Sequence, residues 1–594
     1  MRSLCACIVL FSPVLSWAAP SEHLWAADFQ VRAAAVSPVA NAAFYPDVQA
    51  QDAPAFAGVL DIAQTPLTIQ PELGQPIQQG RDARLFPAIR LEFFSVDGRL
   101  VPAQRGEMLT DISSGSAKSY WRVIAQVGRI WRVPKDGGWA RASFPLMLVS
   151  GIENQAHQGL ASFLYRKGEV TALRLQFVQQ SAPYILSRFV AAGVAPMHAR
   201  DGDASTFTQR EADWRAELAA RLPAQPWQTL LQAAPPGALD DFGGPLYPKW
   251  RIAVALVRDG TLYYQDSHTD YGPYPYPLEM RFGVRSVMKS VGVPLSLLHL
   301  AQIYGPWVLS LKIGDYVKGL DPKWNRVRFI DAANMATGYG GTGTLKTQPN
   351  DIYDGYLEGD YDAWYLAPSQ AAKIERINAN LTPYPWEPGT VVRYRDQDFF
   401  LLGLALDDFL KSRRGPQADI WDMLKKEVLG PIGIAQAPAL RTDEEGGRSG
   451  YVLFNAGYYP TLDDLAKIAL LYQRLGEHGG LQILNRELTA GLLAARGALR
   501  KDGDASIGLG SLSGAGAEFY GMGFHYVPYD GARPGRWLLP TMVGAGENEV
   551  TLYPNGLVSL IMADALKLPN GENARSDAGP QTIRAVERLQ SFGP

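Results

Sequence analysis

The sequence predicts an α/β protein in two parts: a β-rich accessory region over 20–235 that ends in a helix, and an α/β unit over 245–594. Three observations support this prediction. Polar and apolar residues alternate within the first 200 positions, as they do in half-buried strands. The Pro- and Gly-rich segment 234–245 is the clearest break in the chain. After it, strand patterns at both ends enclose several helical patterns, which favours one sheet completed by its C-terminal strands and helix.

The composition is that of a folded protein with many turns. Of the 594 residues, 47% are hydrophobic and 19% are charged, which supplies ample material for a core. The 59 glycines and 42 prolines favour turns and long loops over a helical bundle. A formal net charge of −3 gives no electrostatic reason to expect nucleic acid or an anionic membrane as a partner.

Residues 1–18 have the pattern of a secretory signal peptide. Met1-Arg2 is followed by an apolar stretch that ends in Ser16-Trp17-Ala18. The stretch is too short for a membrane span, which needs about 20 apolar residues. We therefore expect a periplasmic or secreted protein; a buried N-terminal strand is the alternative. Cys5 and Cys7 are the only cysteines, so the mature chain would have no disulfide, cysteine nucleophile or cysteine–zinc site.

The expected elements follow the two-part division. Alternation predicts strands at 120–125, 129–133 and 169–177, and a segment rich in Ala, Leu, Glu and Arg predicts a helix over 208–232. The second part begins with an expected hairpin, 250–257 with 261–264, about Asp259-Gly260. Helical patterns then occupy 284–303, 398–412, 461–474 and 580–591, and strand patterns occupy 519–527 and 549–564.

The most informative chemistry lies where the helix over 284–303 begins. Ser286 is followed three residues later by Lys289, and no other lysine in the chain has a serine at that spacing. Residues three apart share one face of a helix, so the amine can reach the hydroxyl. A hydroxyl is a poor nucleophile until a base removes its proton, and lysine is a base only when its pKa is lowered. A four-residue pattern arises by chance about once in such a chain, so an ordinary surface serine and lysine is the alternative.

Three further segments raise the significance of that pair. They are Tyr394-Arg395-Asp396 after a Pro-Gly turn, the stretch from Ala456 to Lys467 that leads into an amphipathic helix, and Gly544-Ala545-Gly546 before a strand. Taken in order with Ser286 and Lys289, they resemble the serine β-lactamase-related family. That family comprises class C β-lactamases, D-alanyl-D-alanine carboxypeptidases of the same fold and family VIII esterases. The resemblance spans roughly 245–594 and implies an antiparallel sheet flanked by helices, with a helical subdomain over the cleft.

The resemblance also implies roles for individual residues. Ser286 would be the acylated nucleophile, Lys289 its base, and Tyr394 a relay of protons to or from the leaving group. The third family element falls on Met542-Val543-Gly544, and in that register the backbone N–H groups of Ser286 and Ala545 would form the oxyanion hole. No cofactor is needed for this chemistry. No histidine has a histidine partner three or four residues away, so we expect no metal site.

Two positions depart from the family pattern. Asp396 occupies the place of an asparagine, and a carboxylate near Lys289 would favour the ammonium form. Asp396 is therefore expected to turn away, to be protonated, or to bind substrate while Tyr394 carries more of the proton transfer. Met542 occupies the place of a cation that holds substrate carboxylates, and with Gly544 it is expected to line the substrate site. Arg533 and Arg536 lie shortly upstream and could supply the missing charge.

The sequence thus predicts a serine hydrolase that acts on ester or amide bonds of a small-molecule or peptide substrate. Neutral or weakly charged substrates are expected to be preferred over β-lactams, because methionine supplies no charge. A D-peptide carboxypeptidase and a non-catalytic ligand-binding relative are the alternatives. His525 is expected to be structural or solvated, with an approach to the cleft as the alternative. The aromatic loop Tyr271–Tyr276 is either a rim of the cleft or a packed turn. The oligomeric state and the function of the N-terminal part are not predicted.

Overall fold

The structure is a computed structural model of the chain. It describes residues 23–593 apart from 32–34, 182–185, 187, 245–249, 341–359, 385, 446–449, 497–498, 501–518, 532–535 and 565–577. The expected signal peptide over 1–18 and the side chain of Arg533 lie outside the described residues.

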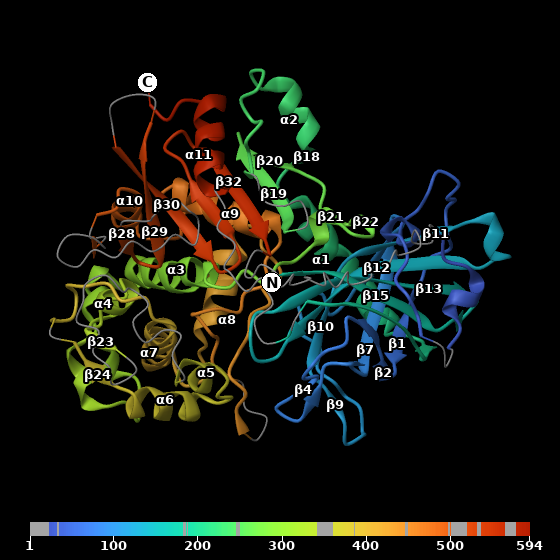
Figure 1. Cartoon of the computed structure of the whole chain (residues 1–594), viewed down its shortest axis with the longest axis horizontal. Helices are drawn as coiled ribbons and strands as arrows, with labels where there is room; N and C mark the ends of the chain where they lie inside the picture. Colours follow the sequence, from blue (N-terminus) through green and yellow to red (C-terminus); the bar gives the residue numbers. More distant parts are fainter. Residues whose placement is uncertain are drawn as a thin grey trace, which may run out of the picture.

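The N-terminal part is built around one antiparallel sheet (Figure 1). Within the described residues it has 12 strands, and both β12 (Ala140–Ser150) and β13 (Ala156–Arg166) are long and buried along nearly their whole length. The alternating residues noted in the sequence form β10 (Trp121–Ala125), β11 (Gly128–Arg132) and β15 (Leu173–Ser181). The other strands of the sheet are β1 (Ala57–Ile62), β3 (Thr68–Gln70), β7 (Ile89–Val96), β8 (Arg99–Pro102), β14 (Glu169–Val170), β16 (Val190–Ala195) and β17 (Met197–Arg200).

The C-terminal part contains a second sheet, of nine strands within the described residues. Its order is β18 (Ala224–Pro226), β20 (Thr261–Tyr264), β19 (Arg251–Arg258), β32 (Val558–Ala563), β31 (Asn548–Leu552), β30 (Arg536–Gly544), β29 (Phe524–Asp530), β28 (Phe519–Gly521) and β27 (Leu499–Arg500). All neighbouring pairs are antiparallel except β18 with β20. The hairpin of β19 and β20 thus pairs with β32, the last strand among the described residues, as the sequence predicts.

Helices cover both faces of the second sheet. Side chains on successive residues of a strand point to opposite faces, so Val254 and Leu256 pack with α2 (Trp227–Ala233) and α11 (Ala578–Leu589). Ala253 and Ala255 belong to the cluster that includes α3 (Val287–Tyr304) and α9 (Leu462–Gln473). The predicted class, an antiparallel sheet flanked by helices beside a β-rich part, is confirmed.

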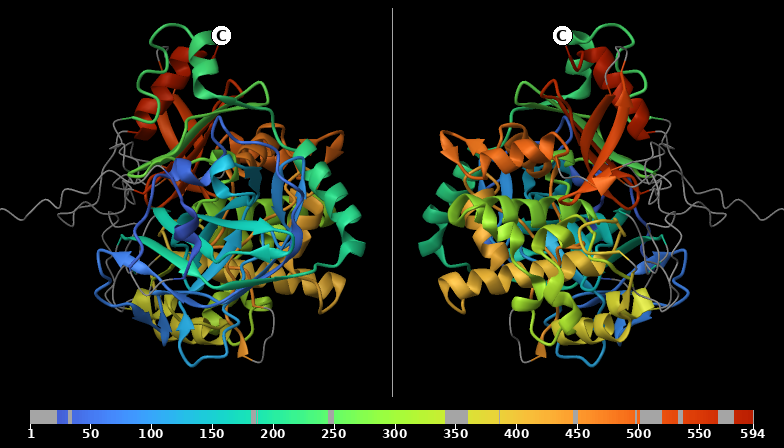
Figure 2. Two further views of the ribbon diagram at one scale, coloured as in Figure 1. Left: turned by 90° about the vertical axis from the view of Figure 1, so that its right-hand side faces the viewer. Right: turned by 90° about the vertical axis from the view of Figure 1, so that its left-hand side faces the viewer.

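A further group of helices lies on the far side of α3 from the sheet. It contains α4 (Phe329–Ala333), α5 (Asp360–Tyr365), α6 (Gln370–Ala379), α7 (Asp396–Arg414) and α8 (Ile420–Leu424). Figure 1 shows α4 to α7 below α3, and Figure 2 shows the same group at the bottom of its right-hand view. Helix α3 packs against α7 on one side and against β30 on the other, which places its N-terminus between the sheet and these helices.

The two parts share one hydrophobic core. Ile124, Met147 and Leu160 from the first sheet belong to the same cluster as Tyr274 and Tyr276, which precede α3. The hydroxyl of Tyr274 donates to the carbonyl of Gly159 at 3.0 Å. The aromatic loop is therefore a packed turn at the interface of the two parts.

Two expectations about boundaries are wrong. The helix expected over 208–232 is divided into α1 (Phe207–Ala219) and α2, because Pro223 and Pro226 interrupt the intervening turn. The boundary between the two parts lies before the segment 234–245 at which the sequence places it. The strand β18 pairs with β20, and α2 packs on the second sheet. The strand patterns over 519–527 and 549–564 are each a hairpin of two strands.

None of the helices in the described part of the chain is both long and apolar enough to cross a membrane.

Candidate functional site

Ser286 stands at the start of α3, where the sequence predicts a nucleophile. Within the fully described segment 280–301 it is the only residue that is not buried. It occupies the N-cap position, yet its side chain does not cap the helix. Its hydroxyl instead accepts a hydrogen bond of 2.7 Å from Lys289 Nζ. The dipole of the helix places positive partial charge at its N-terminus, which favours negative charge that develops at this point.

Three oxygens surround Lys289 Nζ among the described residues. They are Ser286 Oγ at 2.7 Å, the carbonyl of Asn455 at 2.7 Å and Asp396 Oδ1 at 2.5 Å. Lys289 is 1% exposed. Burial lowers the pKa of Lys289 below its ordinary value because it disfavours the ammonium form, and Asp396 opposes that effect. An amine in this setting gives up its proton more readily than a solvated one.

Tyr394 also lies close to the serine hydroxyl. It stands two residues before α7 and is 2% exposed. Burial raises the pKa of Tyr394 well above its ordinary value, and a hydrogen bond with Ser286 opposes that rise. Lys289 Nζ lies 5.0 Å from the centre of the Tyr394 ring. Ser286, Lys289 and Tyr394, which the sequence predicts to act together, are therefore assembled in one place.

Asp396 does not turn away from Lys289, and its expected role as a substrate-binding residue stays a prediction. As the first residue of α7 it is 3% exposed, and both of its oxygens are engaged. Oδ1 faces Lys289, and Oδ2 accepts a hydrogen bond of 2.8 Å from the Tyr361 hydroxyl of α5. Asp396 is thus an internal partner of the lysine.

The end of β30 lies directly against the start of α3. A Cβ added at Gly544 would stand 2.1 Å from the carbonyl oxygen of Val284 and 3.2 Å from the amide nitrogen of Val287. Only glycine permits this approach. In the fully described segment 539–553 the one residue that is not buried is Ala545, which follows directly. The partly exposed Ser286 and Ala545 thus belong to two segments in direct contact, as an oxyanion hole requires.

The expectation that Met542 lines the substrate site is wrong. Met542 is 0% exposed and packs in the core with Val550 and Leu560. It pairs with Val550 of β31 in the interior of the sheet. An apolar residue in the middle of a buried strand lies in the core, and the sequence motif alone did not reveal how deeply this strand is covered.

Several residues of the site were not predicted. The Asn455 carbonyl binds Lys289, one residue before the segment that the sequence singles out at Ala456. Tyr361 binds Asp396 from α5, and no pattern in the sequence marks it. The His525 ring lies 5.8 Å from that of Tyr394, so a histidine expected to be structural borders the site. These partners come from distant segments, which only the fold brings together.

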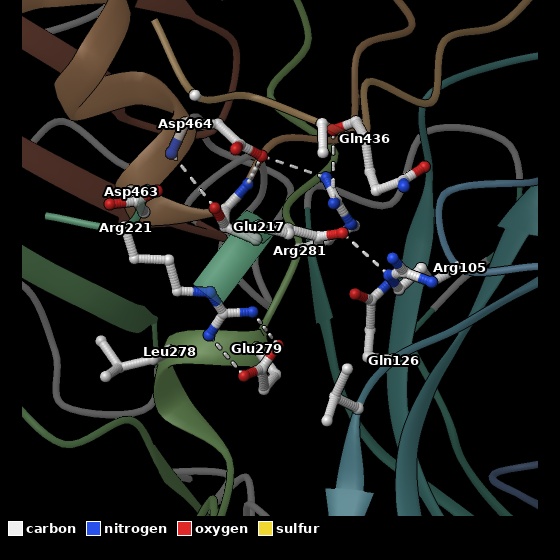
Figure 3. A pocket seen from close by; sticks show the side chains of 14 residues that line it. Arg105, Gln126, Glu217, Arg221, Leu278, Glu279, Arg281, Gln436, Asp463 and Asp464 are labelled. Atoms are coloured by element: carbon white, nitrogen blue, oxygen red, sulfur yellow. Dashed lines mark hydrogen bonds and ion pairs between the residues drawn. The ribbon is translucent and has the colours of Figure 1, made fainter. Parts of the chain in front are cut away.

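A second group of polar residues surrounds a small cavity between the two parts of the chain (Figure 3). The cavity measures about 30 Å³, which is room for about one water molecule. Its charges pair with each other: Arg221 with Glu279 at 2.6 Å, and Arg281 with Asp464 at 3.1 Å. Such pairs fix the interface and leave no charge for a ligand. Within the described residues, no group of three or more His, Cys, Asp or Glu side chains could hold a metal ion.

No model of a protein family matches this chain, and no curated protein matches it either. Solved structures do match. A class C β-lactamase shares 15% identity over 60% of this chain and 96% of its own, with a TM-score of 0.38.

Two other solved structures widen the range of matches. The octameric penicillin-binding protein homologue from Pyrococcus abyssi shares 16% identity over 62% of this chain and 77% of its own, with a TM-score of 0.39. The D-stereospecific amidohydrolase from Streptomyces sp. shares 13% identity over 58% of this chain and 94% of its own, with a TM-score of 0.35. The chain is thus similar in part to a class C β-lactamase, a penicillin-binding protein homologue and a D-stereospecific amidohydrolase. Identities and TM-scores this low carry no argument about activity, so any activity must be inferred from the residues of this chain.

Proposed function

We propose that the protein is a serine hydrolase that forms an acyl-enzyme on Ser286 and hydrolyses ester or amide bonds. The observation that carries the proposal is the hydrogen bond of 2.7 Å between Lys289 Nζ and Ser286 Oγ at the start of a buried helix. A partly exposed alcohol next to a buried amine is the arrangement that an activated serine needs. The ordinary surface serine and lysine that the pattern alone allows is incompatible with a lysine that is 1% exposed.

The proposed reaction has two steps. Lys289, as a free amine, takes the proton of Ser286 Oγ while that oxygen attacks the substrate carbonyl. The N–H groups of Ser286 and Ala545 hold the resulting oxyanion, and such donors lower the barrier by about 3 kcal/mol each. Tyr394 passes a proton to the leaving group as the tetrahedral intermediate collapses. Water then attacks the acyl-enzyme and gives a proton to the Tyr394 phenolate. Lys289 returns its proton to Ser286 Oγ, and the acid is released.

The proposed substrates are neutral or weakly charged esters or amides. Position 542 carries a buried methionine and provides no cation for a substrate carboxylate. We expect p-nitrophenyl acetate to be hydrolysed with a kcat/KM above that for benzylpenicillin and above that for release of D-alanine from a D-alanyl-D-alanine peptide. The Ser286→Ala variant is the control and should be inactive on all three. Efficient hydrolysis of benzylpenicillin or of the peptide would replace this substrate class with the β-lactamase or carboxypeptidase alternative.

A non-catalytic ligand-binding protein is the second candidate. It is favoured by the separation of 2.5 Å between Asp396 Oδ1 and Lys289 Nζ, because the carboxylate stabilises the ammonium form, which cannot act as a base. The two candidates differ in turnover. A hydrolase releases many equivalents of p-nitrophenol for each equivalent of protein, whereas a binding protein releases at most one.

We also propose that the protein is periplasmic or secreted, on the basis of the pattern in residues 1–18. N-terminal sequencing of the exported protein should find a chain that starts near residue 19. A cytoplasmic protein that keeps Met1 would contradict this.

A further inference from the structure

The residue before Ser286 has a constrained backbone conformation. Arg285 has a φ of +52°, in the left-handed region that residues with a Cβ seldom occupy. Such a conformation persists only where the surroundings hold it, and it is frequent at functional sites. One peptide bond joins Arg285 to Ser286. Whatever fixes Arg285 therefore also sets the direction in which Ser286 Oγ points.

The groups that hold Arg285 come from the N-terminal part of the chain. Asn154 Oδ1 accepts a hydrogen bond of 2.5 Å from the Arg285 amide. Glu153 Oε2 accepts one of 2.6 Å from Arg285 Nη1, and the two side chains form an ion pair. Glu153 and Asn154 are both 0% exposed and lie in the turn between β12 and β13. A buried ion pair and a buried amide contact thus meet on the residue before the nucleophile.

The turn that carries these two residues is itself fixed from both sides. Within the turn itself, Glu153 Oε2 also accepts a hydrogen bond of 3.0 Å from the amide of Gln155. On the other side, Asn154 Nδ2 donates to the carbonyl of Tyr458 at 3.3 Å. The Tyr459 hydroxyl donates to the carbonyl of Glu153 at 3.4 Å. The turn is therefore held in register with the second part of the chain, close to the loop whose Asn455 carbonyl binds Lys289.

We propose that Asn154 and Glu153 are positioning residues for Ser286. The N-terminal part of the chain holds the peptide unit before the nucleophile in the conformation that directs Ser286 Oγ toward Lys289 Nζ. Asn154 and Glu153 contact Arg285 and act on the serine through it. This inference rests on the proposed function, and it gives the N-terminal part a role in the reaction.

Variants at Asn154 test this inference, with Gln158 as the matched control. Gln158 is buried in the same interface, and its Nε2 donates to the carbonyl of Arg281 at 2.8 Å, five residues before Ser286. Asn154→Ala removes the contact to the Arg285 amide, whereas Gln158→Ala removes an equivalent contact that is not adjacent to the serine. Asn154→Asp retains an acceptor oxygen for the amide, loses the donor to Tyr458 and introduces an ionisable carboxyl beside Glu153. Glu153→Gln keeps the size of the side chain and removes the charge that faces Arg285.

The full-length protein is used throughout, and the rate constant of its modification by a fluorophosphonate is measured. We expect Asn154→Ala to be modified at least about tenfold more slowly than Gln158→Ala, because small displacements of a reacting group have large effects on rate. The melting temperatures of these two variants should be similar. For p-nitrophenyl acetate the loss should fall on kcat, with KM changed less than about threefold, since the contact positions the serine and does not bind substrate. Asn154→Asp should recover most of the rate, and Glu153→Gln should be slowed.

The outcomes separate this inference from the proposed function. If the wild-type protein is modified at Ser286 and Asn154→Ala reacts as fast as Gln158→Ala, the positioning role is overturned and the proposed function stands. If Asn154→Ala is too unstable to assay, a wild-type rate in Glu153→Gln overturns the role. If the wild-type protein forms no adduct, the proposed function fails, and the inference fails with it.

Discussion

Two features of its surroundings shift the pKa of Lys289 in opposite directions. Burial lowers its pKa, and the Asp396 carboxylate at 2.5 Å opposes that effect. The free amine is the form that can take a proton from Ser286, so activity should rise with pH as Lys289 loses its proton. The pH at which this rise occurs depends on Asp396.

Asp396→Asn tests this dependence. The substitution removes a negative charge that stabilises the ammonium form, so the pKa of Lys289 falls further. The rising limb of the kcat/KM–pH profile should therefore move to lower pH, by about one unit. Tyr361→Phe is the control, because it removes a hydrogen bond to the same carboxylate and leaves its charge in place. An unchanged limb in Asp396→Asn, or a shift to higher pH, would contradict the coupling.

At the scale of single residues, the sequence was informative where the contact is local. Ser286 and Lys289 share a helix face, so their spacing alone predicts the contact that the structure contains. The environment of Asp396 was not predictable, because Tyr361 and Lys289 lie 35 and 107 positions away from it. The burial of Met542 was missed for the same reason: it depends on packing by α3, which a strand motif does not reveal.

Among the elements, the contact between β30 and α3 is the one on which the site depends. It brings Ala545 beside Ser286, and it exists only because Gly544 has no side chain. The obstructing atoms, the Val284 carbonyl and the Val287 amide, belong to the backbone and cannot move aside as a side chain would.

Gly544→Ala should therefore force the strand away from the helix. We expect kcat/KM to fall at least about 100-fold, because the oxyanion donors and the nucleophile no longer meet, and we expect a lower melting temperature. Gly491→Ala in α10 (Arg486–Leu493) is the matched control, since an added Cβ there comes no closer than 3.9 Å to its neighbours. That control should keep full activity and be slightly stabilised, because alanine favours helix over glycine. Wild-type activity in Gly544→Ala would refute the proposed oxyanion hole.

Element types were predictable from periodicity, and their boundaries less so. The helices α3, α7, α9 and α11 lie where apolar spacing placed them. The composition of 208–232 favours a single helix, but Pro223 and Pro226 divide it into α1 and α2. The assignment of β18 to the second sheet depends on a parallel pairing across more than 30 residues, which no local pattern encodes.

The whole molecule is held together by a core that crosses its two parts. Residues of β10, β12 and β13 pack with Tyr274, Tyr276 and Met280, which lead into α3. Burial of apolar area on this scale dominates folding stability. The segment before the nucleophile is thus covered by the N-terminal sheet, and the two-part division predicted from the sequence does not imply independent folding.

Removal of residues 23–200 should expose that segment to water. We expect the shortened chain to enter the insoluble fraction, or to elute as an aggregate, because a large apolar face is left uncovered. The full-length Ser286→Ala variant is the control and should elute as the wild type does. A monodisperse shortened chain that still reacts with a fluorophosphonate at Ser286 would contradict both the shared core and the positioning role of Asn154.

The most direct measurement for the central claim is peptide mapping by mass spectrometry after treatment with a fluorophosphonate. The wild-type protein should carry one adduct, on the peptide that contains Ser286. Lys289→Met, which keeps a long unbranched side chain and removes the amine, should be modified at least about 100-fold more slowly. An adduct on a different residue, or equal rates of modification in the two proteins, would contradict the account.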